Sequence, residues 1–196
     1  FVKPENVINV GIQNISAVDL KYAKENNLTI KLVARANKIE DTVFAFVAPQ
    51  FVPTDHMLAS VRNEYNAVLV EGAFAEKQVF IGKGAGGYPT GSAVLSDISA
   101  LTFDYRYEYK KYTQGEGLSF SNEALLDVIV SFPEGGLLST KDFETFKGGY
   151  QGNGHQYLQG TIKIEKLREW SLTENISVIL APQANLTSIN LQQKVE

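Results

Sequence analysis

The feature that most constrains this chain is a cluster of glycines that follows two strand-like runs and precedes a helical pattern. The strand-like runs cover residues 66–71 and 78–81, and the helical pattern follows the cluster. Glycines at such a junction leave main-chain N–H groups uncovered by side chains and next to the positive end of a helix dipole. A dinucleotide or another anion can approach that backbone closely, so we predict a ligand-contacting loop. The cluster consists of Gly82, Gly84, Gly86 and Gly87.

The spacing Gly82-x-Gly84-x-x-Gly87 matches the dinucleotide fingerprint, which is a weak signal by itself. A complete Rossmann unit runs from strand through helix into a second parallel strand, with an acidic residue about 20 positions on. Here the helical pattern extends from about 91 to 112, so Asp104 falls inside it. The next strand-like segment begins only near Ala124, and the upstream runs read as an antiparallel meander. The sequence therefore argues against a self-contained Rossmann domain.

The composition excludes several classes of protein. A chain of 196 residues suits one large or two small domains with a sizeable core. Its net charge of −4, with acidic and basic residues interleaved, does not indicate a nucleic-acid or membrane partner. It has no cysteine and no apolar run long enough to span a bilayer. No signal peptide precedes its N-x-S/T sequons, so we expect a cytoplasmic protein.

The hydrophobic patterning predicts an α+β fold, with a mixed, largely antiparallel sheet covered by helices. Ser16 and Asp19 form a capping-box pattern that starts one helix, and a second helix begins near Gly91. The predicted strands are 29–36, 42–52, 66–71, 78–81, 125–132, 157–164 and 176–180, with short helices from about 140 and over 165–170.

The second predicted helix carries an apolar stripe and a basic, tyrosine-rich end. The stripe consists of Val94, Ile98, Leu101 and Tyr105, which we expect to pack on the sheet. Residues 104–114 interleave tyrosines with Arg and Lys, a pattern that can bind single-stranded nucleic acid. Cations near a helix C-terminus also favour its dipole, and tyrosines cover interfaces. We therefore favour a structural interpretation and predict no nucleic-acid partner.

Groups able to move a proton or bind a metal are scarce. His56 lies in a turn-like TDHM segment and is expected to hydrogen-bond locally, whereas His155 lies in a glycine-rich loop. Neither is spaced with another His, Asp or Glu in a metal-binding pattern. Glu64 and Glu71 are an odd number of residues apart on a predicted strand and so face opposite sides. The residues predict a ligand-contacting loop without catalytic groups and without a metal.

Three segments, in order, resemble motifs of homoserine dehydrogenases. Residues 10–36 read VGIQNISAVDLKYAKENNLTIKLVARA, and residues 53–72 read PTDHMLASVRNEYNAVLVEG. Residues 82–97 read GKGAGGYPTGSAVLSD. Departures from the family pattern are Met57 for a proline, Gly91 for an alanine and Asn27 for a glycine. Asn27 is a mild change because asparagine tolerates the left-handed conformation at a helix end.

The resemblance implies reversible reduction of L-aspartate 4-semialdehyde to L-homoserine with NAD(P)H, in threonine and methionine biosynthesis. It also implies that the NAD(P)-binding domain and the catalytic residues precede Phe1, so we expect the isolated chain to be inactive. In the family the glycine loop closes over the cofactor. We therefore expect cofactor contacts at Gly86, with Gly84, Gly87 and Thr90 beside it.

The resemblance also suggests a domain organisation. Residues 1–113 would form the catalytic and dimerisation region, 114–122 a linker and 123–196 a small α+β module. The stretch YLQGTIKIEKL resembles the degenerate, ACT-like C-terminal module of some of these enzymes. Because the family's sheet pairs across a two-fold axis, we expect a homodimer. The alternative is a non-catalytic regulatory module that binds an amino acid.

Overall fold

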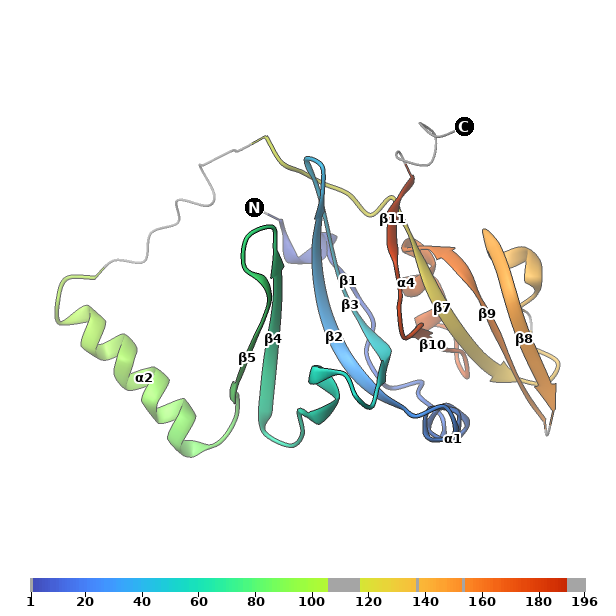
Figure 1. Cartoon of the computed structure of the whole chain (residues 1–196), viewed down its shortest axis with the longest axis horizontal. Coiled ribbons are helices and arrows are strands. Elements are labelled where there is room, and N and C mark those ends of the chain that lie inside the picture. The colour runs from blue at the N-terminus through green and yellow to red at the C-terminus, as the bar shows by residue number, and fades with distance from the viewer. Residues whose placement is uncertain (1, 106–116, 137, 153, 190–196) are drawn as a thin grey trace. The chain divides into compact units, whose positions relative to one another are not determined.

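The computed structural model describes residues 2–105, 117–136, 138–152 and 154–189 (Figure 1). They fall into two compact units, one made of residues 1–53 with 116–196 and the other of residues 54–115. Each unit is described by itself below.

The first unit is built on a nine-stranded mixed sheet with strand order β1-β3-β10-β7-β9-β8. In addition, β2 and β6 pair with β3, and β11 pairs with β7. Five of the pairings are antiparallel, and those of β3 with β1, β6 and β10 are parallel, which confirms the predicted largely antiparallel sheet. The strands are β1 (Ile8–Asn9), β2 (Leu28–Ile39), β3 (Thr42–Pro53), β6 (Ser119–Phe120), β7 (Ala124–Pro133), β8 (Thr145–Gly152), β9 (His155–Lys163), β10 (Ser177–Leu180) and β11 (Leu186–Ser188).

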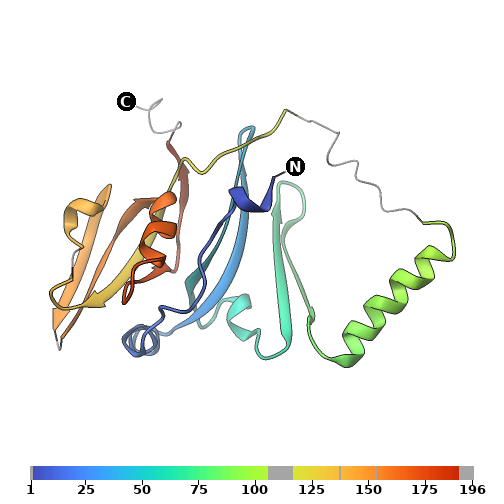
Figure 2. The ribbon, with the colours of Figure 1, turned by 180° about the vertical axis from the view of Figure 1, so that it is seen from behind.

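Two helices cover opposite faces of this sheet. Successive residues of β7, Val128 and Ile129, belong to different core clusters, because side chains alternate between the faces of a strand. Helix α4 (Glu165–Ser171) adds Leu167 and Trp170 to the larger cluster, and Figure 2 shows it lying against the strands. Helix α1 (Ala17–Glu25) adds Ala23 to the smaller one. The predicted covering of the sheet by helices is thus confirmed.

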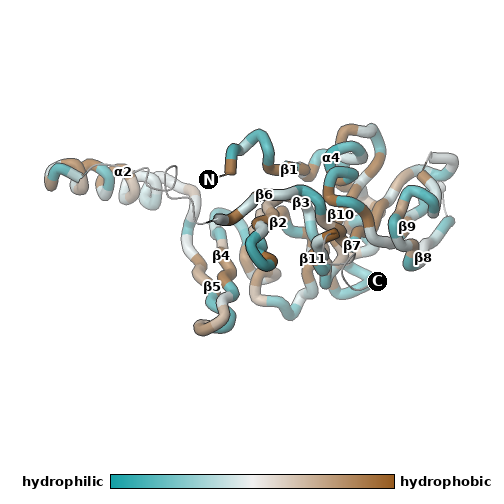
Figure 3. The backbone as a smooth tube through the Cα atoms, turned by 90° about the horizontal axis from the view of Figure 1, so that it is seen from above, coloured by the Kyte–Doolittle hydropathy of each residue, from teal (hydrophilic) through white to brown (hydrophobic). Residues whose placement is uncertain are grey.

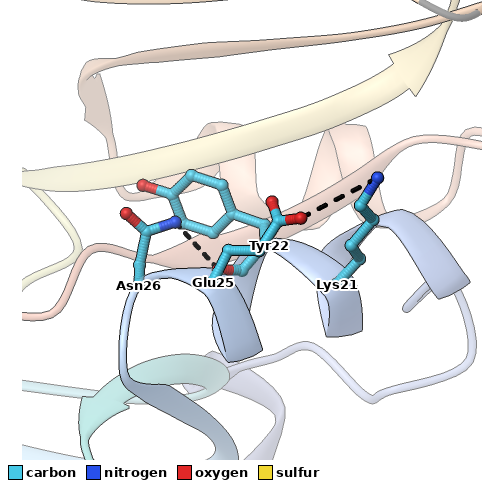
Figure 4. Close-up of polar contacts among 4 residues, drawn as sticks. All are labelled: Lys21, Tyr22, Glu25 and Asn26. Carbon is cyan, nitrogen blue, oxygen red and sulfur yellow. Dashed lines mark hydrogen bonds and ion pairs between the residues drawn. The ribbon is translucent and has the colours of Figure 1, made fainter.

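Helix α1 begins and ends where the sequence predicts. Ser16 and Asp19 form the capping box, and Asn27, with φ 56°, follows the helix in the left-handed conformation. Figure 4 shows its last turn, where the Asn26 side chain donates to the Tyr22 carbonyl at 2.9 Å. An ion pair of 3.8 Å joins Lys21 to Glu25 on the exposed side.

The C-terminal strands form a recognisable substructure within the sheet. Strands β7, β8, β9 and β10 lie in the order β10-β7-β9-β8, and each neighbouring pair is antiparallel. Helix α4 connects β9 to β10, whereas the described residues between β7 and β8 form only a 3₁₀ turn, Thr140–Asp142. This is the order of a β-α-β-β-α-β, ferredoxin-like unit whose first helix is reduced to one turn. The short helix predicted from about residue 140 is thus present, as a three-residue 3₁₀ helix.

Strands on both sides of the predicted 114–122 linker join this one sheet, and Ser119–Phe120 of the linker form β6. The sheet itself marks no boundary there. The functional division into 1–113 and 123–196 stays a prediction.

The second unit consists of a hairpin and a helix. Strands β4 (Tyr65–Gly72) and β5 (Glu76–Lys83) form a two-stranded antiparallel sheet, preceded by a 3₁₀ turn, Met57–Ser60. Helix α2 (Gly87–Leu101) follows β5, and Figure 3 shows apolar positions recurring along it. The helix starts four residues before the predicted Gly91. Pro89 is tolerated there because the first turn of a helix needs no N–H donor.

Within the second unit, the α2 stripe does not pack on the β4–β5 sheet as predicted. No residue of α2 is buried, and Val94, Ile98 and Leu101 are each more than half exposed. Tyr105 lies beyond the end of the helix, and the remainder of the tyrosine-rich segment lies outside the described residues. Among the residues that the structure describes, no helix is long and apolar enough to cross a membrane.

Candidate functional site

The glycine segment connects β5 to α2 and is anchored at the base of the hairpin. The Gly84 N–H donates to the Glu64 carbonyl at 2.8 Å, just beyond the last pair of the β4–β5 ladder. Beside it, Lys83 Nζ lies 3.1 Å from Glu64 Oε1 and 5.5 Å from the centre of the Tyr65 ring. The segment therefore leaves the hairpin in a defined direction.

Glu64 is held in its ionised form in this arrangement. Its pKa lies below the usual value, first because of a backbone hydrogen bond to its carboxylate and second because of Lys83. Glu64 therefore anchors the turn, through its carbonyl to Gly84 and its carboxylate to Lys83.

Gly86 gives the segment its most unusual conformation. Its φ of 114° and ψ of 155° are accessible to glycine and strained for other residues. It is the N-cap of α2, and its carbonyl accepts the first helical hydrogen bond from the Thr90 N–H at 3.1 Å. No side chain caps the helix. The first N–H groups of α2 are therefore available to an anion or another acceptor.

Among the described residues, nothing requires glycine at three neighbouring positions, Gly82, Gly87 and Gly91. A Cβ placed on Gly82, Gly87 or Gly91 would meet nothing within 4 Å in the described structure, and none of the three has a positive φ. Glycine within a helix costs up to about 1 kcal/mol relative to alanine. Of these three glycines, Gly87 lies at the uncapped start of α2, where open backbone admits close approach by a ligand.

An open depression runs along α2 from this point. Gly86, Gly87 and Thr90 line one end, and the far end is apolar. Its complete lining is Gly86, Gly87, Thr90, Gly91, Val94, Leu95 and Ile98. Three of the four predicted cofactor contacts thus lie on one surface, whereas Gly84 lies in the preceding turn. Their contact with a cofactor stays a prediction.

The two histidines do not join this surface. His56 Nδ1 accepts a hydrogen bond from the Leu58 N–H at 3.2 Å and caps the 3₁₀ turn, which confirms its predicted local role. His155 is the first residue of β9, opposite Pro133, and not in a loop as predicted. In the described ranges, no group of three His, Cys, Asp or Glu residues is placed to hold a metal ion.

Asn66 is one residue near the glycine segment that sequence reasoning missed. It lies on β4 opposite Gly82, and its side-chain amide lies against Gly84. A polar residue at the start of a strand-like run carries no distinctive pattern, so only the fold reveals this proximity.

A second group of polar side chains lies on the C-terminal sheet. Asp127 on β7 accepts a hydrogen bond from Thr161 on β9 at 2.7 Å. Lys147 also reaches Asp127 at 2.7 Å, from a β-bulge in β8 between Phe146 and Gly148. The bulge directs Lys147 across β9, so the largely buried Asp127 carboxylate is paired within the chain.

Comparison with known proteins gives a consistent result for the first half of the chain. The family model described as homoserine dehydrogenase matches residues 1–99. A homoserine dehydrogenase from Corynebacterium glutamicum is 42% identical over 102 residues, which cover 50% of this chain and 23% of that protein. One from Synechocystis is 43% identical over 101 residues, with 50% and 23% covered.

Solved structures extend the likeness in fold to most of the chain. The crystal structure of a homoserine dehydrogenase from Thiobacillus denitrificans matches with a TM-score of 0.63 and 22% identity, covering 90% of this chain and 48% of that one. That of S. aureus at pH 8.5 matches with a TM-score of 0.55 and 25% identity, covering 92% and 48%. The chain thus spans about half the length of these solved enzymes.

Proposed function

The chain belongs to the homoserine dehydrogenase family, and on this premise we propose that it is the C-terminal part of an enzyme that reduces L-aspartate 4-semialdehyde to L-homoserine with NAD(P)H. The reaction is reversible and would serve threonine and methionine biosynthesis. The observation that carries this proposal is the family match across residues 1–99, which includes the uncapped glycine segment and most of α2.

The glycine segment is proposed as the part of the cofactor site that this chain contributes. Gly86 has a backbone that only glycine adopts easily, and Gly87 and Thr90 follow it on the same open surface. Bare N–H groups at a helix start suit the pyrophosphate or another polar group of NAD(P). Gly84 shapes the turn that precedes them. The cofactor would supply the hydride, and the remainder of its site would lie in the half of the enzyme that this chain does not cover.

The isolated chain is proposed to be inactive. Among the described residues, the glycine surface carries no histidine, lysine or carboxylate that could move a proton to the reacting oxygen. The chain also covers only 48% of the solved enzymes it resembles, which leaves room for a nucleotide-binding domain and catalytic residues elsewhere.

A chimera tests the function directly. The part of the Corynebacterium glutamicum enzyme that precedes its matched segment would be joined to this chain, which supplies the remainder. We expect NADPH-dependent turnover of aspartate 4-semialdehyde by the chimera and none by the chain alone. Gly86→Val should abolish turnover in the chimera, whereas Gly82→Val, at an open position outside the depression, should not.

Two outcomes would contradict the proposal in different ways. Turnover by the chain alone would show that it is not a partial enzyme. A folded chimera that binds NADPH and homoserine without turnover would show that this segment does not support the reaction.

We also propose a homodimer, because apolar side chains of the second unit are incompletely buried. The two-stranded β4–β5 sheet is too small to be stable alone, and Val68, Val70 and Phe80 on it are about half exposed. Pairing of two copies would bury such residues. Light scattering at tens of micromolar should give twice the chain mass, and a monomer would contradict the proposal.

The C-terminal strands are proposed to form a degenerate ACT-like module. Their order, β10-β7-β9-β8, and the single helix α4 between β9 and β10 support this. Calorimetry with threonine and methionine distinguishes a regulatory module, which would release or absorb heat, from a purely structural one. Binding of an amino acid by the chain would favour the regulatory alternative.

A further inference from the structure

We propose that Asn66 belongs to the cofactor site, its carboxamide held over Gly84 so that its hydrogen-bonding groups face the ligand of the glycine segment. The proposal rests on the function proposed above for that segment. It starts from the hairpin, where Asn66 on β4 lies opposite Gly82 on β5. The two residues that follow Gly82 bring the backbone under the Asn66 side chain.

Gly84 shows where that side chain lies. Unlike Gly86, it has no positive φ, so its backbone would accept an ordinary residue. A Cβ on Gly84, however, would overlap the Asn66 amide nitrogen and lie 2.7 Å from Asn66 Cγ. In this structure the Asn66 carboxamide occupies the space that a Cβ at residue 84 would need. Two glycines of the motif therefore differ in their surroundings: Gly86 has a positive φ, whereas Gly84 has a neighbouring carboxamide.

The Asn66 carboxamide lies next to Gly84 without a hydrogen-bond partner among the described residues. Within the described part of the chain, the Asn66 side chain makes no hydrogen bond, although an amide offers two donors and two acceptor lone pairs. The neighbouring polar groups are already engaged, since Glu64 pairs with Lys83 and its carbonyl accepts from Gly84. Asn66 is exposed, so its amide groups face solvent and are accessible to a ligand of the glycine segment.

Asn66 and Gly84 should act as one unit, which gives a sharp test. An alanine at residue 84 displaces the carboxamide by rotating a flexible side chain, at little cost to folding. Asn66→Ala removes the same carboxamide. Each change should therefore weaken NADPH binding to a similar extent, and the double variant should bind no more weakly than either single one.

The experiment is an NMR titration of the 196-residue chain with NADPH, following the amide signals of Gly86, Gly87 and Thr90. This readout detects millimolar binding, which suits a partial site. We expect about a tenfold rise in Kd for Asn66→Ala and for Gly84→Ala, and the same rise for the double variant. Gly82→Ala, whose Cβ meets open space, is the matched control and should bind normally.

Thermal unfolding separates a ligand contact from a structural role. All four variants should unfold at the wild-type temperature, so that only the cofactor affinity responds. Additive effects of the two single changes, or normal binding by Asn66→Ala, would overturn the role of Asn66. Absence of any NADPH response in the wild-type chain would instead contradict the proposed cofactor contact at Gly86, and the role of Asn66 would fall with it.

Discussion

Ser131 donates a hydrogen bond of 2.6 Å to Asp19 although 112 residues separate them in the sequence. Asp19 is 3% exposed, and its other carboxylate oxygen accepts from the Ser16 N–H and hydroxyl at 2.7 and 2.8 Å. One side chain thus closes the start of α1 and joins it to β7. The predicted capping box accounts for only half of this role.

Replacement of Asp19 should destabilise the first unit strongly. Asp19→Ala leaves the Ser16 and Ser131 donors without their partner in a buried site, which should cost about 3 kcal/mol of unfolding free energy. Denaturant unfolding followed by the fluorescence of Trp170 measures this, because Trp170 is the only tryptophan and lies in the same unit's core.

The chain provides a matched control for that change. Ser139 and Asp142 form a second capping box, but Ser139 is exposed and Asp142 is only partly buried. Asp142→Ala should therefore cost about 1 kcal/mol or less, since water can replace the lost partner. Equal costs at the two sites would show that the link between α1 and β7 contributes nothing.

Gly91→Ala should stabilise α2. Gly91 lies inside the helix, has no positive φ and would meet nothing with an added Cβ. Alanine at such a position favours the helix by about 1 kcal/mol. Amide exchange along α2 should slow in the variant. Gly86→Ala, at φ 114°, should have the opposite sign, and faster exchange in Gly91→Ala would contradict the prediction.

Lys147→Met should weaken the C-terminal sheet by about 1 kcal/mol, because it leaves the Asp127 carboxylate with Thr161 alone. Asp127 is well shielded, with its side chain 15% exposed. Lys163→Met is the control, since its ion pair with Glu144 is longer, at 3.9 Å, and exposed. Unfolding by denaturant should distinguish the two variants, and similar midpoints would contradict a special role for Lys147.

The long strands were predictable because their residues carry the signal locally. β2, β3 and β7 have alternating or continuous apolar runs, and the predicted bounds differ from the observed ones by three residues or fewer at each end. The short strands β1, β6 and β11 exist only because a long strand lies beside them, so no local pattern marks them. β8 escaped prediction because its glycines, including Gly148 and Gly149, dilute the strand signal.

The candidate site was predictable only in part, because some of its contacts come from residues distant in the sequence. The spacing of the glycines marked the segment, and Gly86 does have the backbone that only glycine adopts easily. The sequence could not distinguish Gly86 from Gly84, because the side chain that lies against Gly84 comes from strand β4. The packing of the apolar stripe on α2 could not be predicted either. Amphipathic spacing indicates that one face of a helix is apolar, but it does not identify the surface that covers this face.

Alkaline pH should destabilise the first unit through Tyr22, which packs between Phe51 and Tyr157 at ring-centre distances of 5.2 and 5.1 Å. Burial, and secondly the neighbouring Tyr157, raises the pKa of Tyr22. In the unfolded chain the group ionises near its ordinary pKa of about 10. Its contribution to stability is thus fully present below that pH and is lost as pH rises towards the higher folded pKa.

Tyr22→Phe keeps the ring contacts and removes the titrating hydroxyl, so the variant should lose less stability than the wild type between neutral pH and about pH 11. Tyr88→Phe is the control because that side chain is 95% exposed and makes none of these ring contacts. Denaturant midpoints from Trp170 fluorescence across this pH range measure the difference. Parallel pH profiles for the wild type and Tyr22→Phe would show that the Tyr22 hydroxyl is as well solvated in the folded chain as in the unfolded one.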